Sequence, residues 1–205
     1  MKTLVIIDMQ NDFLSHGALE VKGSERIIPL INQLIPLFDH VVASQDWHPK
    51  NHVSFAKTHG KKSGDSIFLR GRWRPLWKDH CIQSSKGAKI TESLHQEKIE
   101  FVAYKGTDKK WDSYSAFFDD GGESTHLFEF LKKHNLFDLY FVGVATEYCV
   151  KFSVLDALSL GFSVFVIRDA IAALHAGEEE KKSLDEMKKR GAKLIESKDL
   201  FSRRS

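Results

Sequence analysis

The sequence predicts an α/β fold in which helices cover both faces of a parallel β-sheet, in one domain that spans residues 1–205. Six short apolar runs have the length and composition of buried strands. Amphipathic segments, with apolar residues at helical spacing, alternate with several of these runs. Such alternation is typical of parallel sheets, because parallel neighbours need a crossover connection that is usually a helix.

The first half of the chain predicts two strands, one helix and a long region without clear periodicity. Residues 3–8 and 40–44 are short apolar runs, and the first is rich in β-branched residues, which favour strands. Ser24 can cap a helix whose apolar residues recur from position 27 to position 38. Residues 46–98 contain scattered Gly, Pro, Trp and His, so we interpret them as a functional loop region with short elements.

The second half predicts three helices and the remaining strands. Ser124 can cap a helix that ends in a cluster of Lys and His, and another helix is expected to run to about Gly161. The last helix begins with three glutamates from Glu178 and ends with three basic residues, which complements the helix dipole, and Gly191 suits its C-terminus. The four strands expected here are residues 99–104, 139–144, 163–167 and 192–195.

The composition excludes several classes of function. Hydrophobic residues make up 42% of the chain and charged residues 28%, as in ordinary globular proteins. The formal net charge is +2 and basic clusters adjoin acidic ones, so no nucleic-acid partner is expected. No apolar run approaches the ~20 residues that span a membrane, and Asp8 interrupts the N-terminal run, so neither a membrane partner nor a signal peptide is expected. Two cysteines form no disulfide framework, which favours the cytoplasm.

Reactive side chains follow four of the predicted strands. Asp8 ends the first strand, Asp46 and His48 follow the second, Lys105 follows the third and Cys149 follows the fourth. Because the carboxyl ends of parallel strands meet at one edge of a sheet, where ligands bind, these side chains are expected to lie close together.

A cysteine in this position can be a nucleophile or an inert buried side chain. Cys149 lies where a helix is predicted to begin, and the positive end of a helix favours a thiolate. Next to it, Asp8 would be the general base and Lys105 would hold the charged forms in place. Taken singly, Cys149 fits a small buried hydrophobe and Lys105 a surface cation. Cys81, in the segment DHCIQ, is interpreted as structural.

The segment Asp46-Trp47-His48 offers a metal site. Residues two apart in extended backbone point the same way, so Asp46 and His48 can share one ion. His52 and His80 can add nitrogen ligands. Carboxylate and imidazole ligands with open positions suit Zn²⁺, Fe²⁺ or Mn²⁺. In a chain with ten histidines, however, this spacing also arises by chance.

Six motifs, in order, carry a resemblance to a known family. They are IIDMQNDF (6–13), SQDWHPKNHVSF (44–55), PLWKDHCIQ (75–83), YKGTD (104–108), DSYSAF (112–117) and GVATEYCV (143–150). Together they resemble the nicotinamidases of the isochorismatase-like cysteine hydrolase superfamily, over residues 3–170. The resemblance implies a three-layer αβα fold with a six-stranded, mostly parallel sheet. The second and third motifs mark the metal-containing branch of the superfamily.

The resemblance also implies a role for each matching residue. The catalytic triad would be Asp8, Lys105 and Cys149. The metal ligands would be Asp46, His48 and His80, and His52 matches a ligand of some members. The oxyanion hole would be the N–H groups of Ala145 and Cys149, after a cis Val144–Ala145 peptide bond. Phe13, Trp77 and Tyr114 would line the substrate ring. Residues 106–113 vary in length among members, so the contacts of Trp111 are left open.

The implied reaction is hydrolysis of nicotinamide to nicotinate and ammonia through a thioester on the cysteine, in NAD salvage, with pyrazinamide also accepted. The cofactor would be one divalent metal ion, Zn²⁺ first and Fe²⁺ or Mn²⁺ as alternatives. The partner would be the small-molecule substrate, and a homo-oligomer is left open. Three rival hypotheses are a hydrolase of another amide or carbamoyl compound, a non-catalytic binding protein, and a structural metal protein.

Overall fold

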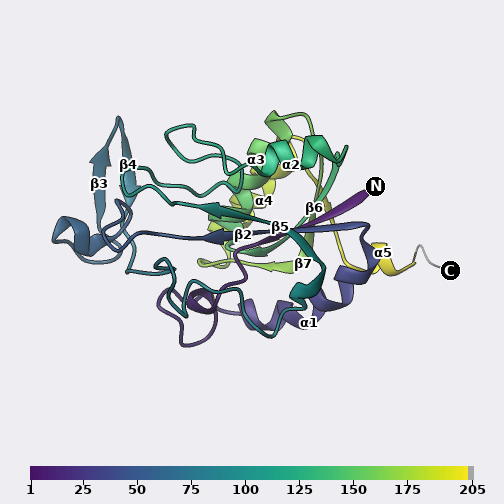
Figure 1. Ribbon diagram of the computed structural model, residues 1–205, viewed down its shortest axis with the longest axis horizontal. Coiled ribbons are helices and arrows are strands. Elements are labelled where there is room, and N and C mark those ends of the chain that lie inside the picture. Colours follow the sequence, from purple (N-terminus) through teal and green to yellow (C-terminus); the bar gives the residue numbers. More distant parts are fainter. Residues whose placement is uncertain (203–205) are drawn as a thin grey trace.

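A computed structural model describes residues 1–202 and contains a six-stranded sheet in the order β5-β2-β1-β6-β7-β8 (Figure 1). Every neighbouring pair in this sheet is parallel. The prediction of a six-stranded parallel sheet is therefore confirmed. Its strands are β1 (Lys2–Ile7), β2 (His40–Asp46), β5 (Ile99–Lys105), β6 (Asp138–Val144), β7 (Ser163–Ala172) and β8 (Lys193–Ile195).

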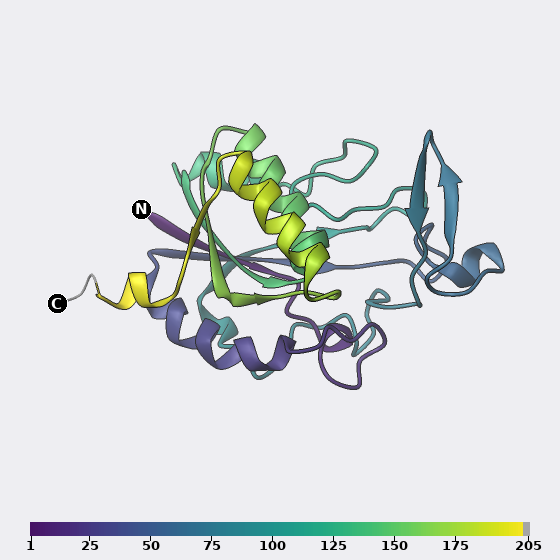
Figure 2. The same cartoon turned by 180° about the vertical axis from the view of Figure 1, so that it is seen from behind.

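Helices cover both faces of the sheet, with α1 and α5 on one side and the other three opposite (Figures 1 and 2). Along β1, Leu4 and Ile6 belong to the apolar cluster that includes α1, whereas Val5 and Ile7 belong to the cluster on the other face. Both faces of the strand are thus buried, which is why its sequence is continuously apolar. The helices are α1 (Ser24–Leu34), α2 (Leu127–Lys133), α3 (Lys151–Ser159), α4 (Glu178–Lys189) and α5 (Lys198–Phe201).

The helix starts differ from the prediction, although the helices themselves are present. Ser24 is the first residue of α1 and donates its hydroxyl to the Phe13 carbonyl, 2.9 Å away, so it ties the helix to an earlier loop and does not cap it. The cap position is Gly23, at φ 87°. Ser124 lies two residues before the cap residue of α2, His126, whose N–H it accepts. Within residues 1–202 no helix has both the length and the hydropathy to cross a membrane.

The region 46–98 contains an antiparallel hairpin that the sequence did not predict. Its strands are β3 (Ser66–Leu69) and β4 (Arg72–Pro75), and they stand apart from the main sheet (Figures 1 and 2). Single 3₁₀ turns occupy Ala56–His59 and Gln96–Lys98. This hairpin, formed by β3 and β4, is called the arm below.

The segment after β6 carries the second cysteine. The Val144–Ala145 peptide bond is cis, as the resemblance implied. One π-helical turn, Thr146–Val150, follows and leads directly into α3. Cys149 therefore lies in a wide turn before the helix, close to the predicted helix start.

Candidate active site

The carboxyl edge of the sheet brings the four predicted reactive residues together. Asp8 follows β1, and Asp46 and Lys105 end the neighbouring strands β2 and β5, where they are direct register partners. Cys149 comes from the turn after β6. All four residues are buried, with Asp8 at 0% and Lys105 at 1% exposure. The structure therefore confirms the expectation, drawn from strand order, that these side chains lie close together.

Lys105 is the centre of this cluster. Its Nζ lies 2.9 Å from Asp8 Oδ2 and 3.3 Å from Cys149 Sγ. It also donates to Asp46 Oδ1, a contact that the sequence did not predict. The Ser44 hydroxyl donates to the other oxygen of Asp8 at 2.7 Å. Asp8 and Cys149 therefore share one ammonium group, and Asp46 shares it too.

Burial and the opposite charges set the protonation of the cluster. Burial alone would lower the pKa of Lys105, but the Asp46 and Asp8 carboxylates outweigh it and raise that pKa well above its usual value. Burial raises the pKa of Asp8, which the Lys105 charge only partly opposes. Burial also raises the pKa of the Cys149 thiol well above its usual value, against the pull of Lys105. The surroundings thus favour the neutral thiol of Cys149 and increase the basicity of the Asp8 carboxyl group.

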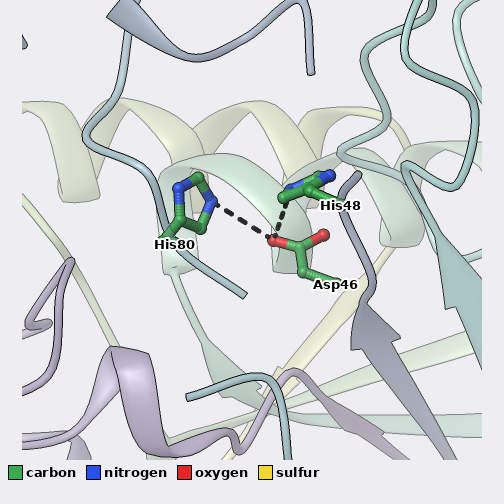
Figure 3. Close-up of side chains that lie close together, drawn as sticks. All are labelled: Asp46, His48 and His80. Atoms are coloured by element: carbon green, nitrogen blue, oxygen red, sulfur yellow. Dashed lines mark ion pairs between the residues drawn. The ribbon is translucent and has the colours of Figure 1, made fainter. Parts of the chain in front are cut away.

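Asp46, His48 and His80 form a second cluster, shown in Figure 3. The Nε2 atoms of His48 and His80 lie 3.6 and 3.7 Å from the same oxygen of Asp46. Each ring holds its Nδ1 against a backbone carbonyl, Gly106 for His48 at 3.0 Å and Lys78 for His80 at 2.7 Å. Nδ1 therefore carries the proton in a neutral ring, and the Nε2 lone pairs converge on the carboxylate.

This donor set fits a divalent metal ion. One ligand atom from each of the three residues lies within 4.8 Å of the others, and all three residues are buried. Imidazole rings whose second nitrogen is held by a carbonyl are typical of metal ligands. Burial alone would lower the pKa of His48, but the Asp46 carboxylate raises it, so positive charge is favoured beside that carboxylate. Lys105 and His48 hold the pKa of Asp46 well below its usual value, although burial opposes them.

His52 lies beside this cluster but is not part of it. Its ring stacks on that of His48 with 4.2 Å between centroids. Its Nε2 lies 2.9 Å from the Trp111 carbonyl, and its Nδ1 lies 2.7 Å from the Ser54 hydroxyl. Burial, aided by the neighbouring His48, lowers the pKa of His52 to about 3, so the ring is neutral. Both nitrogens are thus engaged within the protein, and the structure brings His52 to the site as a neighbour of His48.

A small cavity joins the two clusters. Cys149 and Ala145 lie on its wall together with Asp46, His48 and His80. The three aromatic residues that the resemblance assigned to the substrate ring, Phe13, Trp77 and Tyr114, also line it. Trp77 Nε1 donates to the Tyr114 hydroxyl at 3.0 Å, so two of these residues hold each other in place. Trp111 is outside the set that lines the cavity.

Several wall residues were not singled out from the sequence. Tyr148 and Asp112 lie inside the motifs GVATEYCV and DSYSAF. Their nearness in the sequence to Cys149 and Tyr114 could have identified them as wall residues. Leu174 follows β7 and had no signal; its backbone N–H donates to the buried Glu147 carboxylate at 3.1 Å. Cys81 is fully buried and its N–H donates to Asp12, which agrees with the structural interpretation.

The fold has three layers, with a parallel sheet between two layers of helices. A thiol, an amine and a carboxylate are buried together at the carboxyl edge of this sheet. The chain is therefore an α/β protein with one compact candidate site at the carboxyl edge of its sheet. The family model described as the Isochorismatase domain matches residues 2–199. The chain belongs to this family.

Curated relatives and solved structures agree with this placement. A nicotinamidase from Escherichia coli is 45% identical over 173 residues, which cover 82% of this chain and 81% of the relative. A nicotinamidase and pyrazinamidase from Acinetobacter baumanii superposes with a TM-score of 0.93 at 38% identity and 97% coverage of both chains.

Two ligand-bound structures are also similar to this chain. A protein from L. infantum in complex with nicotinate has a TM-score of 0.86 at 38% identity, covering 97% of this chain and 93% of that one. A pyrazinamidase from Pyrococcus horikoshii in complex with zinc has a TM-score of 0.79 at 36% identity, covering 95% and 98%.

Proposed function

We propose that the protein hydrolyses nicotinamide to nicotinate and ammonia. The observation that carries the proposal is the contact of Lys105 with both Asp8 and Cys149 at the wall of a cavity that a three-residue ligand cluster also lines. A thiol next to a base and a cation is equipped for acyl transfer, in which the cysteine is the nucleophile. The nicotinamidases among its relatives and the nicotinate complex of a similar structure support the choice of substrate.

The cavity suits a small aromatic amide. Phe13, Trp77 and Tyr114 offer apolar ring surfaces, and the limited space favours a single ring. The residues that would hold a metal ion are Asp46, His48 and His80, and the zinc complex of a similar pyrazinamidase favours Zn²⁺ over Fe²⁺ and Mn²⁺. Such an ion supplies a Lewis acid, which would attract the ring nitrogen of the substrate and so orient its carboxamide.

The first half of the reaction forms a thioester. Asp8 accepts the thiol proton of Cys149, and the thiolate attacks the amide carbon. The oxyanion that forms is held by the backbone N–H groups of Ala145 and Cys149, where losing one such donor typically costs about 10²–10³ in rate. Asp8 then gives its proton to the amide nitrogen, the C–N bond breaks, and ammonia leaves.

The second half removes the acyl group. Asp8, ionised again, takes a proton from a water molecule, which attacks the thioester carbon. The C–S bond breaks and nicotinic acid leaves, losing its carboxyl proton to water to give nicotinate, and the Cys149 thiolate recovers the proton from Asp8. Lys105 stays positively charged throughout, because its raised pKa keeps the ammonium protonated, and it stabilises whichever of Asp8 and Cys149 is the anion.

Two extensions rest on the same site. Pyrazinamide has the same carboxamide on a ring of nearly the same size, so it should be a second substrate; a similar solved structure is named for both activities. Nicotinate production would place the enzyme in NAD salvage.

Ammonia release from nicotinamide by the purified protein tests the proposal. The controls are Cys149→Ala and wild-type protein treated with EDTA. We expect release that requires both Cys149 and metal. If metal-loaded wild type releases no ammonia from nicotinamide or pyrazinamide, the proposed substrate is wrong, and a panel of other amides would separate a different hydrolase from a non-catalytic protein.

A further inference from the structure

The arm and the loop between β5 and α2 pack together near the cavity. This loop, residues 106–126, supplies Asp112, Ser113 and Tyr114 to the cavity wall. Both views show the arm standing off the sheet beside the chain that leaves β5 (Figures 1 and 2). The arm is an isolated two-stranded hairpin, which has little stability of its own. Its contacts with the 106–126 loop therefore hold both segments in place.

Arg74, on β4, makes the buried part of this contact. Its side chain is 10% exposed and forms an ion pair with Asp120. Its Nη1 also lies 3.8 Å from Asp112 Oδ2, a carboxylate that is 5% exposed. The two acidic residues are themselves joined, since the Asp120 N–H donates to the Asp112 carbonyl at 2.8 Å. The Arg74 guanidinium group thus bridges the two ends of the segment 112–120. The first residue of that segment, Asp112, lines the cavity.

Arg70, at the tip of the arm, makes the second contact. Its guanidinium carbon lies 3.2 Å from the centroid of the Trp111 ring, a close cation–π arrangement. A Cβ at Gly121 would come within 2.6 Å of the same ring, so the loop folds tightly over the tryptophan. On the other side, the Trp111 carbonyl accepts the Nε2–H of His52. Trp111 is held from two sides one residue before Asp112.

The same two segments supply the aromatic pair of the proposed ring site. Trp77 lies two residues beyond β4, and Tyr114 lies in the 106–126 loop. Their hydrogen bond, from Nε1 to the hydroxyl at 3.0 Å, crosses between the segments. A shift of the arm relative to the loop would therefore change the gap that receives the substrate ring.

We propose that Arg74 is a positioning residue for substrate binding: through Asp112 and Asp120 it fixes the 106–126 loop against the arm, and so sets the spacing of the wall that contains Tyr114 and Trp77. The kinetic test of this role rests on the proposed function, whereas the structural test does not. Arg74 reaches no reacting atom, so it governs how well the substrate fits and not the chemical step.

Arg72 provides a matched control. It lies on the same strand and forms an ion pair with the same Asp120, but its side chain is 54% exposed. Unlike Arg74, it forms no ion pair with Asp112 within residues 1–202. Arg74→Met and Arg72→Met remove the same charge and substitute the same side chain. Removing a buried partner is costly because carboxylates remain without compensation, whereas an exposed pair contributes little.

The kinetic test compares the two variants on nicotinamide. For Arg74→Met we expect a roughly tenfold rise in KM with kcat within about twofold and an unchanged metal content, whereas Arg72→Met should change KM by less than about twofold. Equal KM values for the two variants, or a loss confined to kcat, would overturn the proposal.

Hydrogen exchange of the 106–126 loop provides a readout that needs no substrate. Exchange in this loop should accelerate in Arg74→Met and stay at the wild-type rate in Arg72→Met. If the loop exchanges alike in both variants, the positioning role is refuted even for an active nicotinamidase. If the wild type fails on nicotinamide, this measurement still decides the role of Arg74.

A second variant covers the case in which Arg74→Met does not fold. Arg74→Met combined with Asp112→Asn removes the unpaired buried charge, so this double variant should fold and still show accelerated exchange in the loop. Wild-type exchange in a folded double variant would overturn the proposal.

Discussion

Replacing Lys105 with methionine tests the electrostatic core of the site. Methionine keeps much of the volume but leaves Asp8 and Asp46, both buried, without their common cation. Breaking a buried pair by removing one partner typically costs about 3–5 kcal/mol. Because typical domains have about 5–15 kcal/mol of stability, the variant should remain folded and be strongly destabilised.

The loss should depend on pH, with a sign that the structure determines. Burial already raises the pKa of Asp8, and Lys105 is the main opposing charge, so the substitution raises that pKa further. A carboxyl whose pKa is higher in the folded chain than in the unfolded chain favours folding at low pH and loses that contribution as the pH rises through the folded pKa. The destabilisation should therefore grow as the pH rises above the ordinary carboxyl pKa of about 4, by at most about 1.4 kcal/mol per pH unit.

Urea unfolding in the presence of EDTA measures this effect, since it leaves only the groups of the chain itself. Lys151→Met is the control: its ion pair with Glu186, at 3.6 Å, is partly exposed, so it should cost no more than about 1 kcal/mol and show no pH trend. A Lys105→Met loss below about 1 kcal/mol, or one that does not change with pH, would refute the reasoning.

Three further predictions, two of them with a matched control variant, test the site. Cys149→Ser should abolish ammonia release while unfolding temperature and metal content stay at wild-type values; near-normal turnover would exclude Cys149 as the nucleophile. His48→Gln should lose metal, measured by elemental analysis, whereas His52→Gln should keep it because both ring nitrogens of His52 are already engaged; equal losses would make His52 a ligand. Gly106→Ala should weaken metal binding by about tenfold or more, since a Cβ there overlaps the His48 ring. Gly122 also has a positive φ, +87° against +63° at Gly106, but has open space around it. Gly122→Ala should therefore bind metal normally in a titration, and equal weakening in both variants would contradict the steric argument.

The central strands β1, β2 and β6 could be predicted because they are buried on both faces and read as apolar runs. The arm could not, because only one of its faces is covered. On β4, Arg74 is buried by ion pairs while Trp73 is 71% exposed, so the pattern of polar and apolar residues is the reverse of the usual one. The prediction that Ser24 caps a helix was wrong for a related reason. The hydroxyl of Ser24 donates to the Phe13 carbonyl, a tertiary partner that no local sequence rule indicates.

The candidate site was predicted to the level of residue type and sheet edge, but not to the level of orientation. Strand order placed Asp8, Lys105 and Cys149 together. It could not show that Lys105 also contacts Asp46, because that contact depends on the register between β2 and β5. Likewise, spacing identified His52 as a nitrogen donor near Asp46, whereas the direction of its ring follows from Trp111, 59 positions away in the chain.

The wide separation of the reactive residues along the chain has a consequence for folding. Lys105 and Cys149 are 44 positions apart; Lys105 ends β5, whereas Cys149 lies in the turn that follows β6. Contacts between such distant segments form slowly, because the loops that separate them must close first. Until β5, β2, β1 and β6 are paired in that order, Cys149 is an ordinary thiol with a pKa of about 8.5. In a partly folded chain, Cys149 thus lacks the neighbouring groups that would make it a catalytic nucleophile. The rate at which a thiol reagent modifies Cys149 during refolding would therefore report how fast the sheet assembles.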